Sequence, residues 1–134
     1  MRKITEIIIH CTATPAGRDV TAKDVTAWHR ERGFRTIGYH YLVGLRGNVE
    51  KGRPEHETGA HCKGHNAGSI GVAYVGGLNA AGQPADTRTE TQKMALKRLV
   101  ADLRQRYPGA SVHGHREFAA KACPCFDAGK EYGQ

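Results

Sequence analysis

Two short apolar runs, each ended by a polar residue or a turn, constrain the fold of this chain more than any other feature. Residues 5–10 read TEIIIH and residues 69–75 read SIGVAYV. Runs of this length, rich in β-branched residues, are typical of strands buried inside a sheet. Because segments with helical periodicity separate the apolar runs, the sequence predicts an α/β domain. A length of 134 residues favours one domain over residues 1–134.

Two capping boxes mark the expected helices. Thr21 and Asp24 begin a helix over about 22–32 that stops at Gly33. Thr89 and Gln92 begin a longer helix that Pro108 ends. Its expected buried face consists of Met94, Leu96, Leu99, Val100, Leu103 and Tyr107.

The remaining segments predict a hairpin, a long loop and one more strand. Residues 39–45 and 48–51 flank an Arg-Gly turn and favour a hairpin. Residues 52–68 lack apolar periodicity, and loops of this length are usually functional, so this loop is a candidate binding rim. Residues 110–113 read as a short strand, and the segment that follows it is irregular and rich in polar groups.

The net positive charge of the chain limits the classes of partner that we expect. There are 20 Lys and Arg against 13 Asp and Glu, a net charge of +7, which attracts polyanions such as nucleic acid or an anionic cell envelope. The basic residues are scattered and not interleaved with aromatic residues, so we do not expect stable nucleic-acid binding.

Compartment and redox state follow from the first residues and the cysteines. The apolar run 4–9 is interrupted by Glu6 and is shorter than a secretory core, so we expect no signal peptide. No segment reaches the length of a membrane span. The expected site of synthesis is the cytosol, where four cysteines favour thiols or metal ligands over disulfides.

Polar residues at expected strand ends are candidates for a metal site. His10 ends the first strand, and His113 and His115 end the last one. Together with Cys123, His10 and His115 would offer three protein ligands, the number that a catalytic zinc uses. The spacing alone leaves a second interpretation open, in which His10 is a hydrogen-bonded strand-end histidine and Cys123 a small buried apolar residue.

Four ordered blocks carry a resemblance to a known family. They are IIIHCTAT (7–14), GYHYLV with GNVEKGR (38–43 and 47–53), GAHCKGHNAGSIGVAYVGG (59–77) and HREFAAKACPCFD (115–127). Together they resemble zinc-dependent type 2 N-acetylmuramoyl-L-alanine amidases, most closely the small phage lysozymes of that family, and more distantly peptidoglycan recognition proteins. The resemblance implies a central mixed β-sheet flanked by helices.

The resemblance also implies roles for individual residues. It places one Zn²⁺ ion on His10, His115 and Cys123, and it makes Tyr39 and Lys121 catalytic helpers. Zinc lowers the pKa of bound water and polarises an amide carbonyl, and an ammonium and a phenol can stabilise the resulting oxyanion. Two proton donors to the leaving amine stay open, Tyr39 and the metal-bound water.

Further residues are assigned by their place in the family blocks. His61, Lys63 and Asn66 are expected to contact substrate, because the family's glycine-rich loop borders its groove. We expect structural roles for His29 and His40. Cys125 and His113 are alternative ligands to Cys123 and His115, and alanine variants would separate each pair.

These expectations define the functional hypotheses. The first is a peptidoglycan amidase, most simply a phage or prophage endolysin that is stored in the host cytoplasm and acts on the cell wall after release. It is expected to be monomeric and not membrane-bound. The alternatives are a non-catalytic peptidoglycan-binding module and a cytosolic amidase that recycles muropeptides. Some phage relatives also bind and inhibit a phage RNA polymerase, which gives a regulatory hypothesis.

Overall fold

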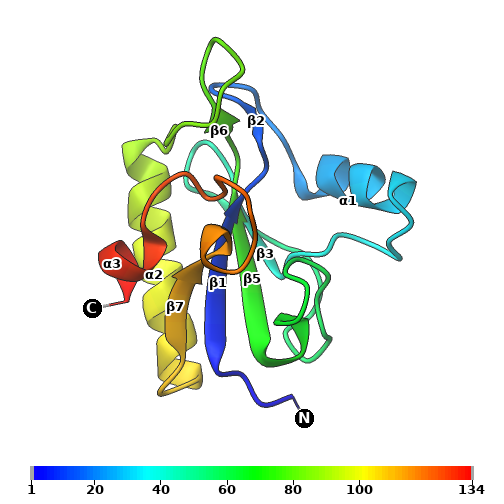
Figure 1. Cartoon of the computed structure of the whole chain (residues 1–134), viewed down its shortest axis with the longest axis vertical. Coiled ribbons are helices and arrows are strands. Elements are labelled where there is room, and N and C mark those ends of the chain that lie inside the picture. The colour runs from blue at the N-terminus through cyan, green and yellow to red at the C-terminus, as the bar shows by residue number, and fades with distance from the viewer. Residues whose placement is uncertain (1, 134) are drawn as a thin grey trace.

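Five strands form one mixed sheet at the centre of the protein (Figure 1). The structure is a computed structural model and describes residues 2–133. The sheet order is β4–β3–β5–β1–β7, and only the β3–β4 hairpin is antiparallel. The strands are β1 (Glu6–Cys11), β3 (Tyr41–Val43), β4 (Val49–Lys51), β5 (Ser69–Tyr74) and β7 (Ser111–Gly114). The expected α/β fold with a central mixed sheet is confirmed.

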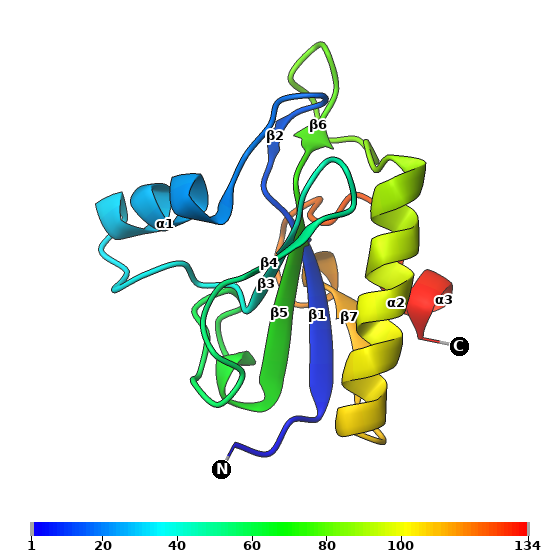
Figure 2. The ribbon, with the colours of Figure 1, turned by 180° about the vertical axis from the view of Figure 1, so that it is seen from behind.

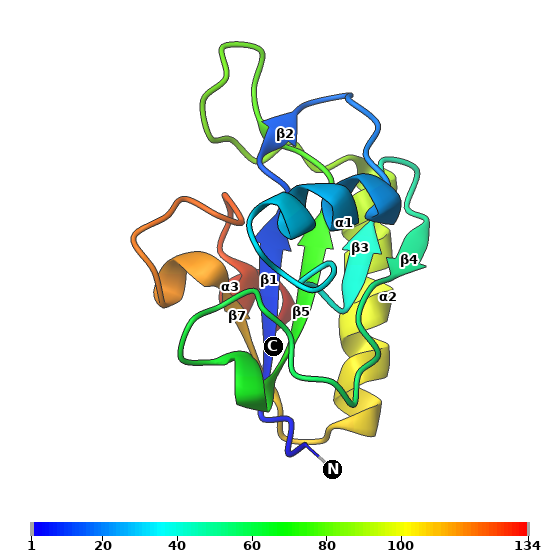
Figure 3. The same cartoon turned by 90° about the vertical axis from the view of Figure 1, so that its right-hand side faces the viewer.

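The two longer helices cover opposite faces of this sheet, as Figure 3 shows with α1 in front and α2 behind. Helix α2 (Glu90–Arg106) packs on the face that carries Ile7 and Ile9 of β1. Helix α1 (Ala22–Glu31) packs over a smaller core around Leu42 and Ala73. Since side chains alternate along a strand, His10 points away from α2 and toward the face of α1.

Both capping boxes form as expected. Thr21 accepts a hydrogen bond from the backbone of Asp24, and Thr89 accepts one from the backbone of Gln92. The prediction that Met94 belongs to the buried face of α2 is wrong, because Met94 is 59% exposed. Gln92 is buried instead, and its side-chain amide donates to the carbonyl of Val75 at 2.9 Å. Across residues 2–133, no helix combines the length and the apolar character that a membrane span requires.

Several short elements escaped the sequence analysis. Strands β2 (Thr14–Pro15) and β6 (Gly77–Leu78) pair in parallel as a second, two-stranded sheet. Two 3₁₀ turns, η1 (Asn66–Gly68) and η2 (His115–Glu117), lie in segments expected to be irregular. Helix α3 (Ala128–Tyr132) lies beside α2 in Figure 2. These elements contain two to five residues, and none of them shows a periodic apolar pattern of its own.

A buried arginine fastens the C-terminal segment to the body of the protein. The Arg88 side chain is only 2% exposed and forms ion pairs with Asp86 at 2.9 Å and Glu131 at 2.7 Å. Its guanidinium also lies over the ring of Phe126, 3.4 Å from the centroid, and donates to the hydroxyl of Tyr132. These contacts join α3 and the segment before it to the chain ahead of α2.

Candidate active site

Three side chains of residue types that can ligate a metal come together beside the end of β1, from distant parts of the chain. His10 comes from β1, His115 from η2 and Cys123 from the loop that follows η2. One ligand atom of each residue lies within 4.8 Å of the other two. Two imidazoles and one thiolate are a donor set that suits zinc and leaves a fourth position for water. The structure therefore brings together the three residues that the resemblance indicated.

The surroundings favour the protonation states that bind metal. Burial lowers the pKa of His10 well below its usual value, and the neighbouring histidines lower it further. Burial and the charge of Lys121 lower the pKa of His115. Hydrogen bonds from the thiol and the backbone of Cys11 lower the pKa of the Cys123 thiol. Neutral imidazole and thiolate are the forms that coordinate a metal ion.

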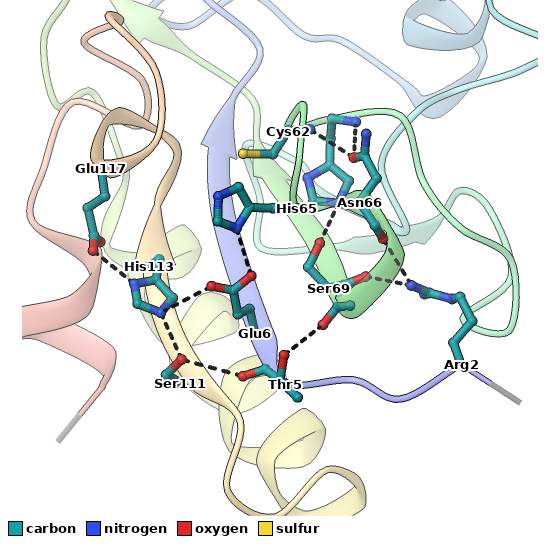
Figure 4. A network of polar contacts seen from close by, with 12 residues as sticks. Arg2, Thr5, Glu6, Cys62, His65, Asn66, Ser69, Ser111, His113 and Glu117 are labelled. Atoms are coloured by element: carbon teal, nitrogen blue, oxygen red, sulfur yellow. Dashed lines mark hydrogen bonds and ion pairs between the residues drawn. The ribbon is translucent and has the colours of Figure 1, made fainter.

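The two alternative ligands point elsewhere. His113 hydrogen-bonds to Ser111 at 2.7 Å and to Glu117 at 2.8 Å, in the polar network drawn in Figure 4. The Cys125 thiol lies 3.6 Å from the carbonyl oxygen of Gly77. Neither belongs to the converging set among the described residues. The geometry therefore favours His115 and Cys123 over them.

A groove of about 620 Å³ opens over the converging ligands. Tyr39 and Lys121, the expected catalytic helpers, both line it. The Tyr39 ring centroid lies 5.1 Å from that of His10 and 5.3 Å from that of His29. Burial raises the pKa of Tyr39, so its hydroxyl keeps its proton and can donate a hydrogen bond.

The three expected substrate contacts line the same groove. Lys63 is exposed at the rim, whereas His61 and Asn66 are half-buried. The side-chain oxygen of Asn66 accepts hydrogen bonds from the backbone N–H groups of His61 and Cys62, both at 2.9 Å. Asn66 thus shapes the turn that carries the other two residues. Direct contact of these residues with substrate stays a prediction.

The structural roles expected for His29 and His40 rest on similar hydrogen bonds. Nδ1 of His29 accepts from the backbone N–H of Gly38 at 2.8 Å, and burial lowers the pKa of His29 to about 4. Nδ1 of His40 accepts from the backbone N–H of Gly71 at 3.0 Å, and its side chain is fully buried. His29 differs from His40 in that it also lines the groove.

The α1 end of the groove contains residues that the sequence analysis did not single out. Arg32 and Phe34 follow α1 and line the groove, with the guanidinium 5.0 Å from the centre of the Phe34 ring. They lie in a turn after the helix, where neither periodicity nor a motif distinguishes a groove residue from a solvent-exposed one. Only the position of α1 over the sheet identifies them.

At the opposite end, an aromatic contact joins the loop before β5 to the segment after β7. The rings of His65 and Phe118 stack with centroids 3.9 Å apart and an angle of 23°. Nδ1 of His65 also pairs with Glu6 of β1 at 2.9 Å (Figure 4). Because Phe118 lines the groove, this stack links one groove residue to the loop before β5.

Comparisons with known proteins show the family to which the chain belongs. Residues 1–126 match the model of a protein family described as N-acetylmuramoyl-L-alanine amidase. The endolysin of Klebsiella phage KP32 is 40% identical over 126 residues, which cover 94% of this chain and 83% of that protein.

Solved structures show the same architecture. The N-acetylmuramoyl-L-alanine amidase LysC from Clostridium intestinale superposes with a TM-score of 0.82 at 26% identity, covering 97% of this chain and 82% of that one. Drosophila peptidoglycan recognition protein SD superposes with a TM-score of 0.78 at 26% identity, covering 92% and 76%. Both the expected amidase-like fold and the more distant likeness to recognition proteins are confirmed.

Proposed function

Because this chain belongs to the N-acetylmuramoyl-L-alanine amidase family, we propose that it hydrolyses the lactyl amide bond between N-acetylmuramic acid and L-alanine with a zinc ion held by His10, His115 and Cys123. The convergence of these ligand atoms within 4.8 Å carries the proposal. A peptidoglycan-binding module without catalysis has no use for a complete set of three ligands. The complete set therefore favours an enzyme.

The site combines a metal position with groups that act on the amide. When bound, zinc would activate water and polarise the carbonyl oxygen of the scissile amide. Lys121 lines the groove close enough to lower the pKa of both His10 and His115 through its charge. Its ammonium group would stabilise the negative charge that develops on the amide oxygen during attack.

Tyr39 supplies a neutral hydrogen-bond donor beside His10. Its raised pKa keeps the hydroxyl protonated at neutral pH. In this position it would orient the amide or donate a hydrogen bond to the developing oxyanion. Tyr39 is also a candidate proton donor to the departing amine of L-alanine.

The biological role that fits best is lysis at the end of a phage or prophage cycle. The KP32 relative is an endolysin, and the match covers most of both chains. We expect the enzyme to be made in the host cytoplasm, to be monomeric and to reach the wall after release. The regulatory hypothesis is tested separately, by transcription with a phage RNA polymerase in the presence of the purified protein.

The decisive experiment is a digest of purified peptidoglycan. New L-alanine amino termini and new reducing sugar ends are counted with the protein as purified, with a chelator, and with zinc restored. We expect amino termini that disappear with the chelator and return with zinc. The same protein preparation is used in all three arms. A loss of amino termini that zinc reverses therefore reports on the metal.

Other products would contradict the proposal. Reducing ends would indicate a glycosidase and a different set of catalytic residues. Amino termini that persist after complete metal removal would exclude a role for zinc in the hydrolysis. Sacculi that are bound but not cut would indicate a binding module.

A further inference from the structure

His61 contacts one of the metal-ligand candidates directly. Its Nδ1 atom lies 2.8 Å from Nε2 of His10, and the two rings meet edge to face at 87°. A hydrogen bond between two imidazole nitrogens needs one N–H and one lone pair. The direction of this bond decides which nitrogen of His10 is free for a metal ion.

Only one direction is compatible with His10 as a ligand. If His61 donated, neutral His10 would carry its proton on Nδ1 and accept with Nε2, so neither nitrogen would have a lone pair for an ion. If His10 donates from Nε2, its Nδ1 keeps its lone pair. His61 then carries its own proton on Nε2, which lies 3.2 Å from the hydroxyl oxygen of Ser69 and can donate to it.

The position of His61 is fixed from several sides. Its backbone N–H donates to the side-chain oxygen of Asn66. Asn66 begins η1 and Ser69 begins β5, and both are drawn in Figure 4. The ring of His61 packs on the backbone of β5, where a Cβ atom on Gly71 would come within 2.6 Å of it. A Cβ atom on Gly59 would come within 2.8 Å. The absence of side chains at both glycines thus makes room for the ring.

We propose that His61 is a positioning residue, which accepts a hydrogen bond from Nε2–H of His10 and thereby directs Nδ1 of His10 to the metal ion. This inference rests on the proposed zinc site. It changes the expected role of His61, because the ring acts through His10 instead of primarily binding substrate. Metal-bound histidines commonly donate their second N–H to a fixed acceptor, and this acceptor raises metal affinity.

Three variants test the inference. His61→Ala removes the acceptor, and His61→Asn places an amide oxygen near the position of Nδ1 and so can restore it. Lys63→Ala is the matched control for zinc affinity, because Lys63 lines the same groove and does not belong to the converging set of ligand candidates. Zinc dissociation constants are measured by competition with a chromogenic chelator. NMR of the imidazole nitrogens in the zinc-free protein gives the tautomer of His10.

The expected results follow from the bond direction. In the zinc-free wild type, His10 carries its proton on Nε2. His61→Ala raises the zinc dissociation constant by about 10- to 100-fold and gives a mixture of His10 tautomers. His61→Asn recovers most of the affinity, and Lys63→Ala leaves it unchanged. At saturating zinc, His61→Ala lowers kcat more than it raises KM.

Several outcomes would overturn the inference. A His10 proton on Nδ1 in the wild type would reverse the bond, and this measurement needs no variant to fold. If His61→Ala bound zinc within twofold of the wild-type affinity and had a raised KM, His61 would be a substrate contact. That result would overturn this inference and leave the proposed zinc amidase function unaffected. A wild type that binds no zinc would overturn both this inference and the proposed function.

Discussion

The Sγ atom of Cys123 accepts a hydrogen bond from the backbone N–H of Cys11 at 3.2 Å, across 112 residues of sequence. This contact holds the thiol beside the end of β1, next to His10. The partners of the two nearby thiols differ, because the Cys125 thiol faces the carbonyl of Gly77. The two thiols are two residues apart in the chain and still differ in what they can bind.

Metal content should therefore distinguish the two cysteines. We expect Cys123→Ala to lose tightly bound zinc, because it removes one of the three converging ligands. Cys125→Ala should keep one zinc ion per chain. The measurement is elemental analysis after dialysis against a weak chelator.

The histidines offer a parallel comparison. His115→Ala should lose zinc, and His113→Ala should keep it, since His113 is engaged with Ser111 and Glu117. If Cys125→Ala lost zinc and Cys123→Ala kept it, the assignment of the thiolate ligand would be wrong. The same holds for the histidine ligand if His113→Ala lost zinc and His115→Ala kept it.

Lys121 should matter for the chemical step and little for folding, because its side chain is exposed at the rim of the groove. We expect Lys121→Ala to lower kcat by about 100-fold, the loss typical for one oxyanion-stabilising group. The thermal midpoint should stay unchanged. Lys97→Ala on α2 is the control, and equal kinetics of the two variants would exclude a role for Lys121 in catalysis.

Tyr39→Phe tests the hydroxyl without removing the ring that packs on His10 and His29. Loss of one hydrogen-bond donor to the reacting amide should lower kcat by about 10- to 100-fold. Zinc content and thermal midpoint should match the wild type. A variant with full kcat would assign both the oxyanion contact and the proton transfer to other groups.

The stability of the protein should fall in mild acid, in part through His29. Its pKa is lowered from 6.5 to about 4, so the unfolded chain takes up a proton at a higher pH than the folded one. The contribution of His29 is therefore complete above pH 6.5 and is lost as the pH falls toward 4.

The variant His29→Asn isolates this contribution, since its side-chain oxygen can still accept from the N–H of Gly38. Thermal midpoints from pH 7 to pH 4 should fall less steeply in His29→Asn than in the wild type. The other histidines are the same in both proteins, so parallel slopes would contradict the assignment to His29.

Removal of the buried Arg88 side chain should lower the free energy of unfolding more than removal of an exposed ion pair. Arg88→Ala leaves Asp86 and Glu131 without their partner and opens a gap under Phe126, for an expected loss of about 3 kcal/mol in the free energy of unfolding. Lys93→Ala, which removes an exposed pair with Glu90, should cost less than about 0.5 kcal/mol. Equal denaturation midpoints for the two variants would contradict this difference.

Periodic and capped segments were predictable from the sequence. Both capping boxes, the β3–β4 hairpin and the apolar runs of β1 and β5 depend on neighbouring residues, and all formed as expected. Met94 was misplaced because helical spacing cannot distinguish the edge of an apolar face from its centre. The same limit hid the burial of Gln92, which depends on carbonyl groups at the ends of β3 and β5.

The candidate site was predictable only in part. Block resemblance indicated His10, His115 and Cys123, and the structure brings them together. The contact between His10 and His61 had no signal in the sequence, because it depends on how the loop before β5 folds back over β1. Arg32 and Phe34 likewise reach the groove only through the packing of α1 on the sheet.

The long separation of the ligand candidates would couple the proposed metal binding to folding. His10 lies on β1, whereas Cys123 follows the last strand of the sheet, so the unfolded chain has no preformed site. An ion bound only by the folded form stabilises it by about 2.7 kcal/mol when its free concentration is 100 times the dissociation constant. The concentration of free zinc in the surroundings would then set the fraction of the enzyme that is folded as well as its activity.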